Sequence, residues 1–210
     1  MFINHRFVTK ELSALGNGLL YEYLVGSNGV FVRAARAGLR ATVWVASTAR
    51  MIRGLQEIAP NVEIDTRVPA SLTQRMLDLA KENAGKEILF YLAYRDGAWA
   101  LQIPEQIQSA GNVRPLDPFV GGTDTLIEVH SHHNMGAFFS LTDNQEEQAG
   151  FRVYAVLGRV EHNPAINCRV GIYGHFCEIP AEWVFELPAG MVDASYPIDI
   201  EENEESEYVD

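Results

Sequence analysis

The chain has 210 residues, 47% of them hydrophobic and 10% aromatic, which is enough apolar material for a full core. Its formal charge of -12 comes from 28 acidic and 16 basic side chains, and the absence of a basic stripe argues against a nucleic-acid partner. The sequence has no apolar run near the roughly 18 residues of a membrane span and no signal-peptide pattern, so we expect a cytoplasmic protein without a membrane partner.

Residues 1–61 are predicted to form a small β-rich N-terminal region. Two strands are expected at 18–25 and 30–33, because the intervening Gly-Ser-Asn-Gly sequence is typical of a hairpin turn. Another strand is expected at 41–46. Thr48 is a suitable cap for a short helix through Ile58. No motif in this region indicates chemistry.

Residues 62–196 are predicted to form a second unit. A strand at 62–68 precedes an amphipathic helix that Ser71 caps and Gly85 ends. The strands that we expect after it are a hairpin at 87–94 and 98–103, a buried strand at 125–129, and two more at 151–157 and 168–173, with one or two helical turns at 142–149. This order predicts an α/β fold, a mixed β-sheet flanked by few helices.

Two features outside these elements have simple interpretations. Cys168 and Cys177 are expected to be reduced thiols in adjacent strands, because two cysteines cannot staple a domain of this size. Residues 197–210 are expected to be a disordered acidic tail. Without the seven acidic residues of this tail the charge is about -5, which is ordinary for a soluble domain.

The most informative segment runs from His130 to Asp143. The apolar, β-branched sequence before it predicts a buried strand, on which His130 and His132 point to the same side and Ser131 points away. Asp143 follows far enough behind for a loop to return its carboxylate to the histidines. Two imidazoles and one carboxylate leave the fourth position of a zinc tetrahedron open, as in catalytic zinc sites, which predicts a zinc-dependent hydrolase.

Such a hydrolase needs a general base, and the sequence offers several. Glu128 lies on the histidine strand and shares their face. Glu105 is expected on a loop. Glu87 opens a strand directly after the helix, where a side chain can project into a cleft at the end of the sheet. These residues alone do not decide among the three.

The segment resembles the metal motif of the JAMM (MPN-plus) metalloproteases, His-Ser-His-Pro, six residues, Ser, two residues, Asp. It matches at His130, Ser131, His132, Ser140 and Asp143, and departs where His133 replaces proline. The family's upstream glutamate, in Glu-x-x-Gly-x-Leu-x-Gly, corresponds to Glu87, although both glycines are missing here. The resemblance covers about residues 62–185 and implies a JAB/MPN-type fold.

The resemblance also implies roles for these residues. His130, His132 and Asp143 would bind zinc, Glu87 would act as the general base, and the Ser140 hydroxyl would stabilise the oxyanion. A narrower resemblance, in residues 138–143 and 169–176, is to family members from bacterial PRTRC cassettes, which also encode ThiF-like and ubiquitin-like proteins. It implies a peptidase or isopeptidase acting at the C-terminus of a ubiquitin-like protein, with an E1/ThiF-like protein as a further partner.

Two alternatives to this function are a catalytically silent scaffold or binding module of the same fold and a RadC-like protein associated with DNA. The complete ligand set argues against the first, and the acidic charge argues against the second. Exposed sheet edges would also allow a homodimer.

Overall fold

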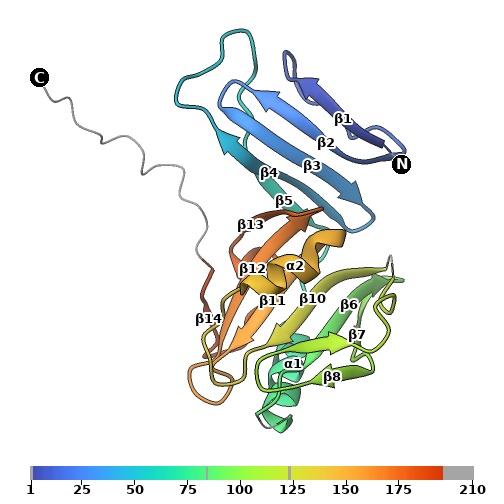
Figure 1. The fold of residues 1–210 in the computed structure, drawn as a ribbon, viewed down its shortest axis with the longest axis vertical. Helices are drawn as coiled ribbons and strands as arrows, with labels where there is room; N and C mark the ends of the chain where they lie inside the picture. Colours follow the sequence, from blue (N-terminus) through green and yellow to red (C-terminus); the bar gives the residue numbers. More distant parts are fainter. Residues whose placement is uncertain (1, 84, 123, 196–210) are drawn as a thin grey trace, which may run out of the picture.

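The structure is a computed structural model that describes residues 2–83, 85–122 and 124–195. Its strands form two main sheets, a five-stranded N-terminal sheet and a seven-stranded sheet, which follow one another along the long axis of the molecule (Figure 1). The mixed α/β fold class is confirmed. The predicted acidic tail at 197–210 lies outside the described residues.

The N-terminal sheet has the strand order β1-β2-β3-β4-β5. The predicted hairpin is confirmed, since β2 and β3 pair antiparallel across Ser27 and Asn28. β1 precedes them in the chain and pairs parallel to β2 at the edge of the sheet. The strand bounds are β1 Phe2–Phe7, β2 Leu19–Gly26, β3 Gly29–Arg36, β4 Leu39–Ser47 and β5 Asn61–Ile64.

The predicted helix from Thr48 to Ile58 is wrong, because this segment is irregular. Its polar groups bond to the β2–β3 hairpin instead: the Asn28 side-chain amide donates to Ile58 O (2.9 Å) and its oxygen accepts from Ile58 N (3.1 Å). The Ile58 side chain is buried against Phe31. Gly54, at φ 86°, also lies outside the helical region. Hydrogen bonds to the β2–β3 hairpin and burial of the Ile58 side chain therefore stabilise an irregular segment here instead of a helix.

The predicted start of the second unit at residue 62 falls inside a strand of the first sheet. β5 pairs antiparallel with β4, so residues 61–64 complete the N-terminal sheet. The chain then passes to the second sheet, where the Val68 amide donates to Val184 O (2.8 Å). The division of the chain into domains remains a prediction, but the sheets themselves change after Ile64.

The second sheet has the order β13-β12-β11-β10-β6-β7, with β14 paired to β12. β10 occupies the middle of this sheet, parallel to β11 and antiparallel to β6. The elements of this part are α1 Ala70–Glu82, β6 Leu89–Arg95, β7 Ala98–Gln102, β8 Gln106–Gln108, β9 Val113–Pro115, β10 Thr125–Ser131, α2 Leu141–Glu146, β11 Phe151–Gly158, β12 Ala165–Ile172, β13 His175–Glu178 and β14 Val192–Asp193, with short 3-10 turns at Glu147–Ala149 and Ala181–Trp183.

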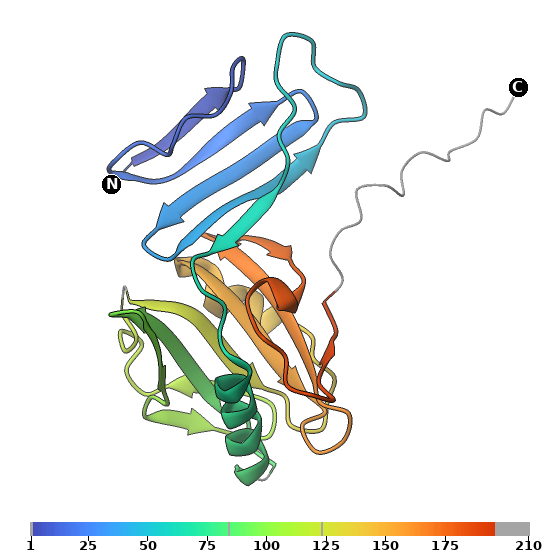
Figure 2. The same ribbon diagram turned by 180° about the vertical axis from the view of Figure 1, so that it is seen from behind.

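The two helices cover opposite faces of this sheet. α2 lies in front of the sheet in Figure 1, whereas α1 is in front in the reverse view of Figure 2. Met76 and Leu77 of α1 belong to the main core, together with Ile127 and Val129 of β10. The alternate residues of β10 therefore point to the α2 face, as the period of two in a strand requires.

Three local predictions need correction or addition. Ser71 is not the cap of α1, because the N-cap is Pro69, which has no side-chain cap hydrogen bond. The small β8–β9 hairpin, between the strands predicted at 98–103 and 125–129, was missed, as was β13.

The cysteine prediction is confirmed: Cys168 and Cys177 are free thiols on the adjacent strands β12 and β13.

The N-terminal sheet contacts the second sheet through aromatic side chains. The rings of Tyr21 and Tyr173 stack with centroids 5.3 Å apart, and Tyr23 Oη lies 2.8 Å from His175 Nε2. Several residues of the N-terminal sheet belong to the same hydrophobic core as α1 and β10. Among the described residues, no helix has the length and apolar character needed to cross a membrane.

Candidate metal centre

β10 brings the two histidines to the α2 face of the second sheet. His130 lies on β10 and His132 follows its last residue, and both are buried. The His132 amide donates to Leu157 O (2.7 Å), which extends the parallel pairing to β11 by one step. As expected from the alternation of a strand, the two imidazoles meet: their Nε2 atoms are 3.2 Å apart.

Asp143 returns to the histidines at the start of α2. Ser140 is the N-cap of this helix and forms a capping box with Asp143. The Ser140 amide donates to Asp143 Oδ2 (2.6 Å), and the Asp143 amide donates to Ser140 Oγ (3.2 Å). This leaves Asp143 Oδ1 directed towards the imidazoles, 3.6 Å from His130 Nε2.

The spacing of these atoms suits a tetrahedral zinc ion. Two ligands at zinc–ligand distances near 2.05 Å lie about 3.3 Å apart in a tetrahedron. The observed separations are 3.2 Å between the histidine nitrogens and 3.6 Å from His130 to Asp143. The ligand atoms of all three residues lie within 4.8 Å of one another, so this group could hold a metal ion.

The protonation of the imidazoles also fits a metal site. Burial lowers the pKa of His130 to about 4 and also lowers the pKa of His132, so both rings are neutral at pH 7. His132 Nδ1 donates to Gly136 O (3.2 Å), because a carbonyl can only accept. The lone pair of His132 therefore lies on Nε2, the atom that faces His130.

 Glu87 lies between α1 and β6, close to the side chains of the three candidate metal ligands. Glu87 and all three of those side chains line one cavity of about 100 Å³, and Glu87 is 4% exposed. Burial raises the pKa of the Glu87 carboxyl to about 7, and the negative charge of Asp143 adds to the increase. A carboxyl group with this pKa can both accept and release a proton at neutral pH.

Ser131 connects the histidine strand to the segment that carries Glu87. Its side chain points away from the imidazoles, as expected, and its Oγ accepts from the Ile88 amide (3.1 Å). The Ser131 amide in turn donates to Ile88 O (3.1 Å). Because Ile88 is the next residue after Glu87, these bonds fix the position of Glu87 relative to His130 and His132.

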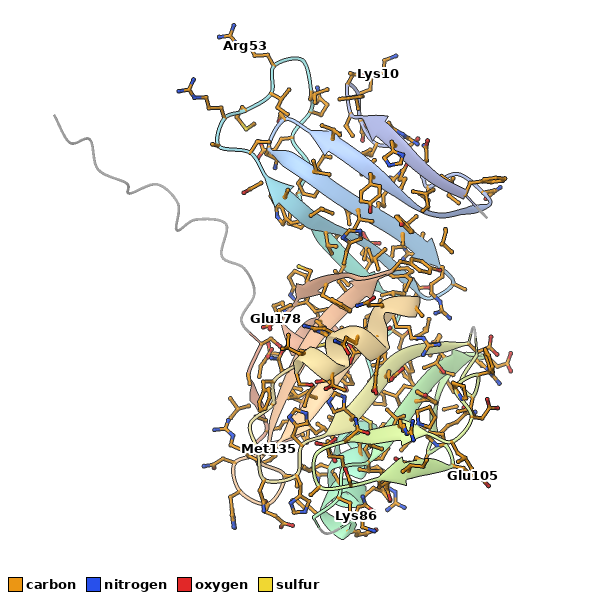
Figure 3. The ribbon with its side chains drawn as sticks, viewed as in Figure 1. Lys10, Arg53, Lys86, Glu105, Met135 and Glu178 are labelled. Carbon is orange, nitrogen blue, oxygen red and sulfur yellow. The ribbon has the colours of Figure 1, made fainter. Side chains whose placement is uncertain are left out.

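The other two base candidates lie in different surroundings. Glu128 lines the same cavity, but its Oε2 is paired with Arg152 Nη1 at 3.0 Å. Glu105 is exposed and does not line the cavity. Figure 3 shows Glu105 on the opposite side of this part of the molecule from Met135, which does line it. The geometry therefore favours Glu87 as the base.

Two residues that the sequence analysis did not single out shape the loop between His132 and Asp143. Gly158, at the end of β11, allows a close approach of this loop: a Cβ there would lie 2.2 Å from Ala137 N. Arg169 of β12 is buried, pairs with Glu147, and has its guanidinium 3.8 Å from the centre of the Phe139 ring. Gly158 directly follows the strand predicted at 151–157, and a glycine at the end of a strand was the available signal for the first contact.

His133, the one departure from the family motif, adopts a backbone conformation closed to proline. Its φ is 44°, whereas the proline ring holds φ near -65°. Its Nε2 lies 3.9 Å from Glu161 Oε1 and does not line the cavity. The metal-binding residues of the motif are therefore present, but the backbone at residue 133 has a conformation that proline cannot adopt.

Comparison with protein families agrees with this geometry. Residues 69–169 match the family model described as prokaryotic homologs of the JAB domain. Over this range the chain is similar to prokaryotic JAB domains. The match begins at the N-cap of α1 and ends within β12, so it includes Glu87, both histidines, Ser140 and Asp143. No curated protein matches the chain. The resemblance to the JAB/MPN family is thus confirmed, and the narrower resemblance to PRTRC members remains a prediction.

Proposed function

We propose that the JAB domain is a zinc-dependent peptidase or isopeptidase that cleaves at the C-terminus of a ubiquitin-like protein or its conjugates. The observation that carries the reaction type is that the ligand atoms of His130, His132 and Asp143 lie within 4.8 Å of one another, in a cavity that Glu87 also lines. The substrate class comes from the resemblance to the JAMM family and its cassette partners.

The residues of the cavity would divide the work as follows. His130, His132 and Asp143 would hold the zinc ion, which would supply Lewis-acid activation of water and of the scissile carbonyl. Glu87 takes a proton from the attacking water and passes it to the leaving amine, for which a pKa of about 7 is well suited.

Ser140 has two compatible roles. Its Oγ accepts the Asp143 amide hydrogen as part of the helix cap, which leaves the hydroxyl hydrogen free to donate. Ser140 lines the cavity, so this hydrogen is available to the oxyanion that forms at the attacked carbonyl. The same side chain therefore orients a ligand and stabilises developing charge.

The test is cleavage of the ubiquitin-like protein of a PRTRC cassette, extended at its C-terminus by a short peptide and analysed by mass spectrometry. We expect cleavage that needs zinc and stops in Glu87→Gln, with a loss of at least about 10²-fold while zinc is still bound. Glu105→Gln, on the other side of the domain, is the matched control and should remain active. Zinc binding without cleavage would favour the silent scaffold, and salt-dependent DNA binding would favour the RadC-like alternative.

A further inference from the structure

The short helix α2, which carries Asp143, is not held in place by apolar packing. None of its six residues, all of which the structure describes, is buried, and Leu141 is 81% exposed. The bonds of its capping box join Ser140 to Asp143, within the same segment. A helix this short is marginal by itself, so its position on the sheet depends on contacts with other elements.

Arg169 of β12 contacts this segment at three points. The residue is 4% exposed. Its Nη1 donates to Asn144 Oδ1, and its Nε donates to Glu147 Oε2 (3.0 Å). Its guanidinium carbon also lies 3.8 Å from the centre of the Phe139 ring, which is a cation–π contact. Figure 1 shows α2 across the front of the sheet to which β12 belongs.

These contacts lie on both sides of the residues that act at the metal centre. Phe139 directly precedes Ser140, and Asn144 directly follows Asp143. Contacts at both positions fix the intervening turn relative to β12. Because β12, β11 and β10 are neighbours in one sheet, the same contacts fix Asp143 relative to His130.

Arg169 is itself fixed by the elements around it. The ring of Phe176, on β13, lies 4.0 Å from its guanidinium carbon. Its partner Glu147 is buried, and the backbone carbonyl of Glu147 accepts from Tyr154 Oη of β11 (3.0 Å). A guanidinium has several donors in a rigid planar fork, so it can bond to Asn144 and Glu147 together in one geometry.

The metal centre tolerates little displacement of Asp143. Its Oδ1 is 3.6 Å from His130 Nε2, close to the separation of two ligands on one zinc ion. Zinc–ligand distances stay within about 0.2 Å of their usual values. A shift of α2 by more than about 0.5 Å would therefore take the carboxylate out of a productive position.

Resting on the proposed function, we propose that Arg169 is a positioning residue of the metal centre. Through Phe139, Asn144 and Glu147 it holds the turn that carries Asp143, so that the carboxylate completes the zinc site with the two histidines. Arg169 acts through these residues and is not a zinc ligand. Partners that orient metal ligands in this way typically change metal affinity by about 10–100-fold.

The test measures zinc affinity by competition with a chromogenic chelator, so it needs no substrate. Arg169→Met removes the guanidinium, and we expect its zinc affinity to fall about 10–100-fold. Its cobalt-loaded form should also absorb visible light more weakly, because a site that loses Asp143 to solvent departs from tetrahedral geometry. Asn144→Ala removes one contact and leaves Arg169 paired with Glu147, so it should fold and lose about fivefold in zinc affinity, as for one hydrogen bond.

Arg33→Met is the matched control, because Arg33 forms a similar pair in the N-terminal sheet. Like Arg169 with Glu147, it donates through Nε and Nη2 to one oxygen of a buried glutamate, Glu22. Both arginine substitutions should lower the free energy of unfolding of the metal-free chain in urea, since each leaves a buried carboxylate without its partner. Only Arg169→Met should weaken zinc binding.

Unchanged zinc affinity in Arg169→Met and Asn144→Ala overturns the proposal. An equal loss of affinity in Arg33→Met also overturns it, because reduced stability alone would then explain the effect. If Arg169→Met does not fold, the zinc affinity of Asn144→Ala decides. Weakened zinc binding in these variants, without cleavage by the unmodified chain, would keep the role of Arg169 and overturn the proposed function; cleavage with full zinc affinity in both variants would do the reverse.

Discussion

Glu87→Gln is expected to make the metal-free protein more stable while removing its activity. The Glu87 carboxyl is buried, and its pKa is raised to about 7 from an ordinary value near 4.5. Each pKa unit corresponds to about 1.36 kcal/mol, so ionising this group costs the folded state about 3 kcal/mol above pH 7. Because the carboxyl faces a cavity that water can enter, we expect a gain of about 1–3 kcal/mol in Glu87→Gln.

The pH dependence of this gain follows from linkage. Between about pH 4.5 and 7 the folded state holds the Glu87 proton more tightly than the unfolded state does, so the free energy of unfolding falls as the pH rises. Below this window both states are protonated, and the substitution should change little. Above it the whole gain should be present.

The assay is urea unfolding of both proteins at about pH 4 and about pH 8 after removal of metal with a chelator. Metal must be absent, because a bound cation would favour the ionised carboxylate. Glu105→Gln is the control for loss of an exposed carboxylate. If Glu87→Gln is no more stable than the unmodified chain at about pH 8, the reasoning about its burial and pKa is refuted.

Three further substitutions test the supports of the metal centre. Gly158→Ala places a Cβ 2.4 Å from Gly136 C and should displace the Gly136 carbonyl, which orients the His132 ring. We expect zinc binding to weaken about 10–100-fold in a chelator competition, and an unchanged zinc affinity would contradict this. Ser131→Ala leaves the buried Ile88 amide without its Oγ acceptor and should lower the free energy of unfolding by about 1–3 kcal/mol in urea, whereas a change near zero would mean that the bond is dispensable. His133→Pro forces the backbone away from φ 44° and should lower the melting temperature, although proline is the usual residue of the family motif; an unaltered melting curve would show that this loop has no fixed conformation.

The parts of the site that the sequence predicted depend on short-range geometry. The alternation of β10 was sufficient to put His130 and His132 together, because strand periodicity does not depend on the rest of the fold. The helical turns after Ser140 were also predicted, and their capping box is what returns Asp143 to the imidazoles.

The parts that were missed depend on contacts between distant segments. The segment after Thr48 has a cap residue but no helix, since the β2–β3 hairpin offers its backbone better partners. β5 joined the first sheet because of its pairing with β4, which no local pattern in residues 61–64 discloses. Likewise, Gly136 O orients His132 only because Gly158 lets the loop approach β11, a contact between residues more than twenty positions apart.

The central claim is that His130, His132 and Asp143 form one zinc site with an open position. Its most direct test is zinc content by mass spectrometry of the metal-loaded chain, combined with zinc K-edge X-ray absorption. We expect about one zinc per chain, bound by two imidazole nitrogens and oxygen ligands at about 2.0–2.1 Å, and little zinc in Asp143→Ala. A chain that takes up no zinc, or that keeps its full zinc content in Asp143→Ala, would contradict the account.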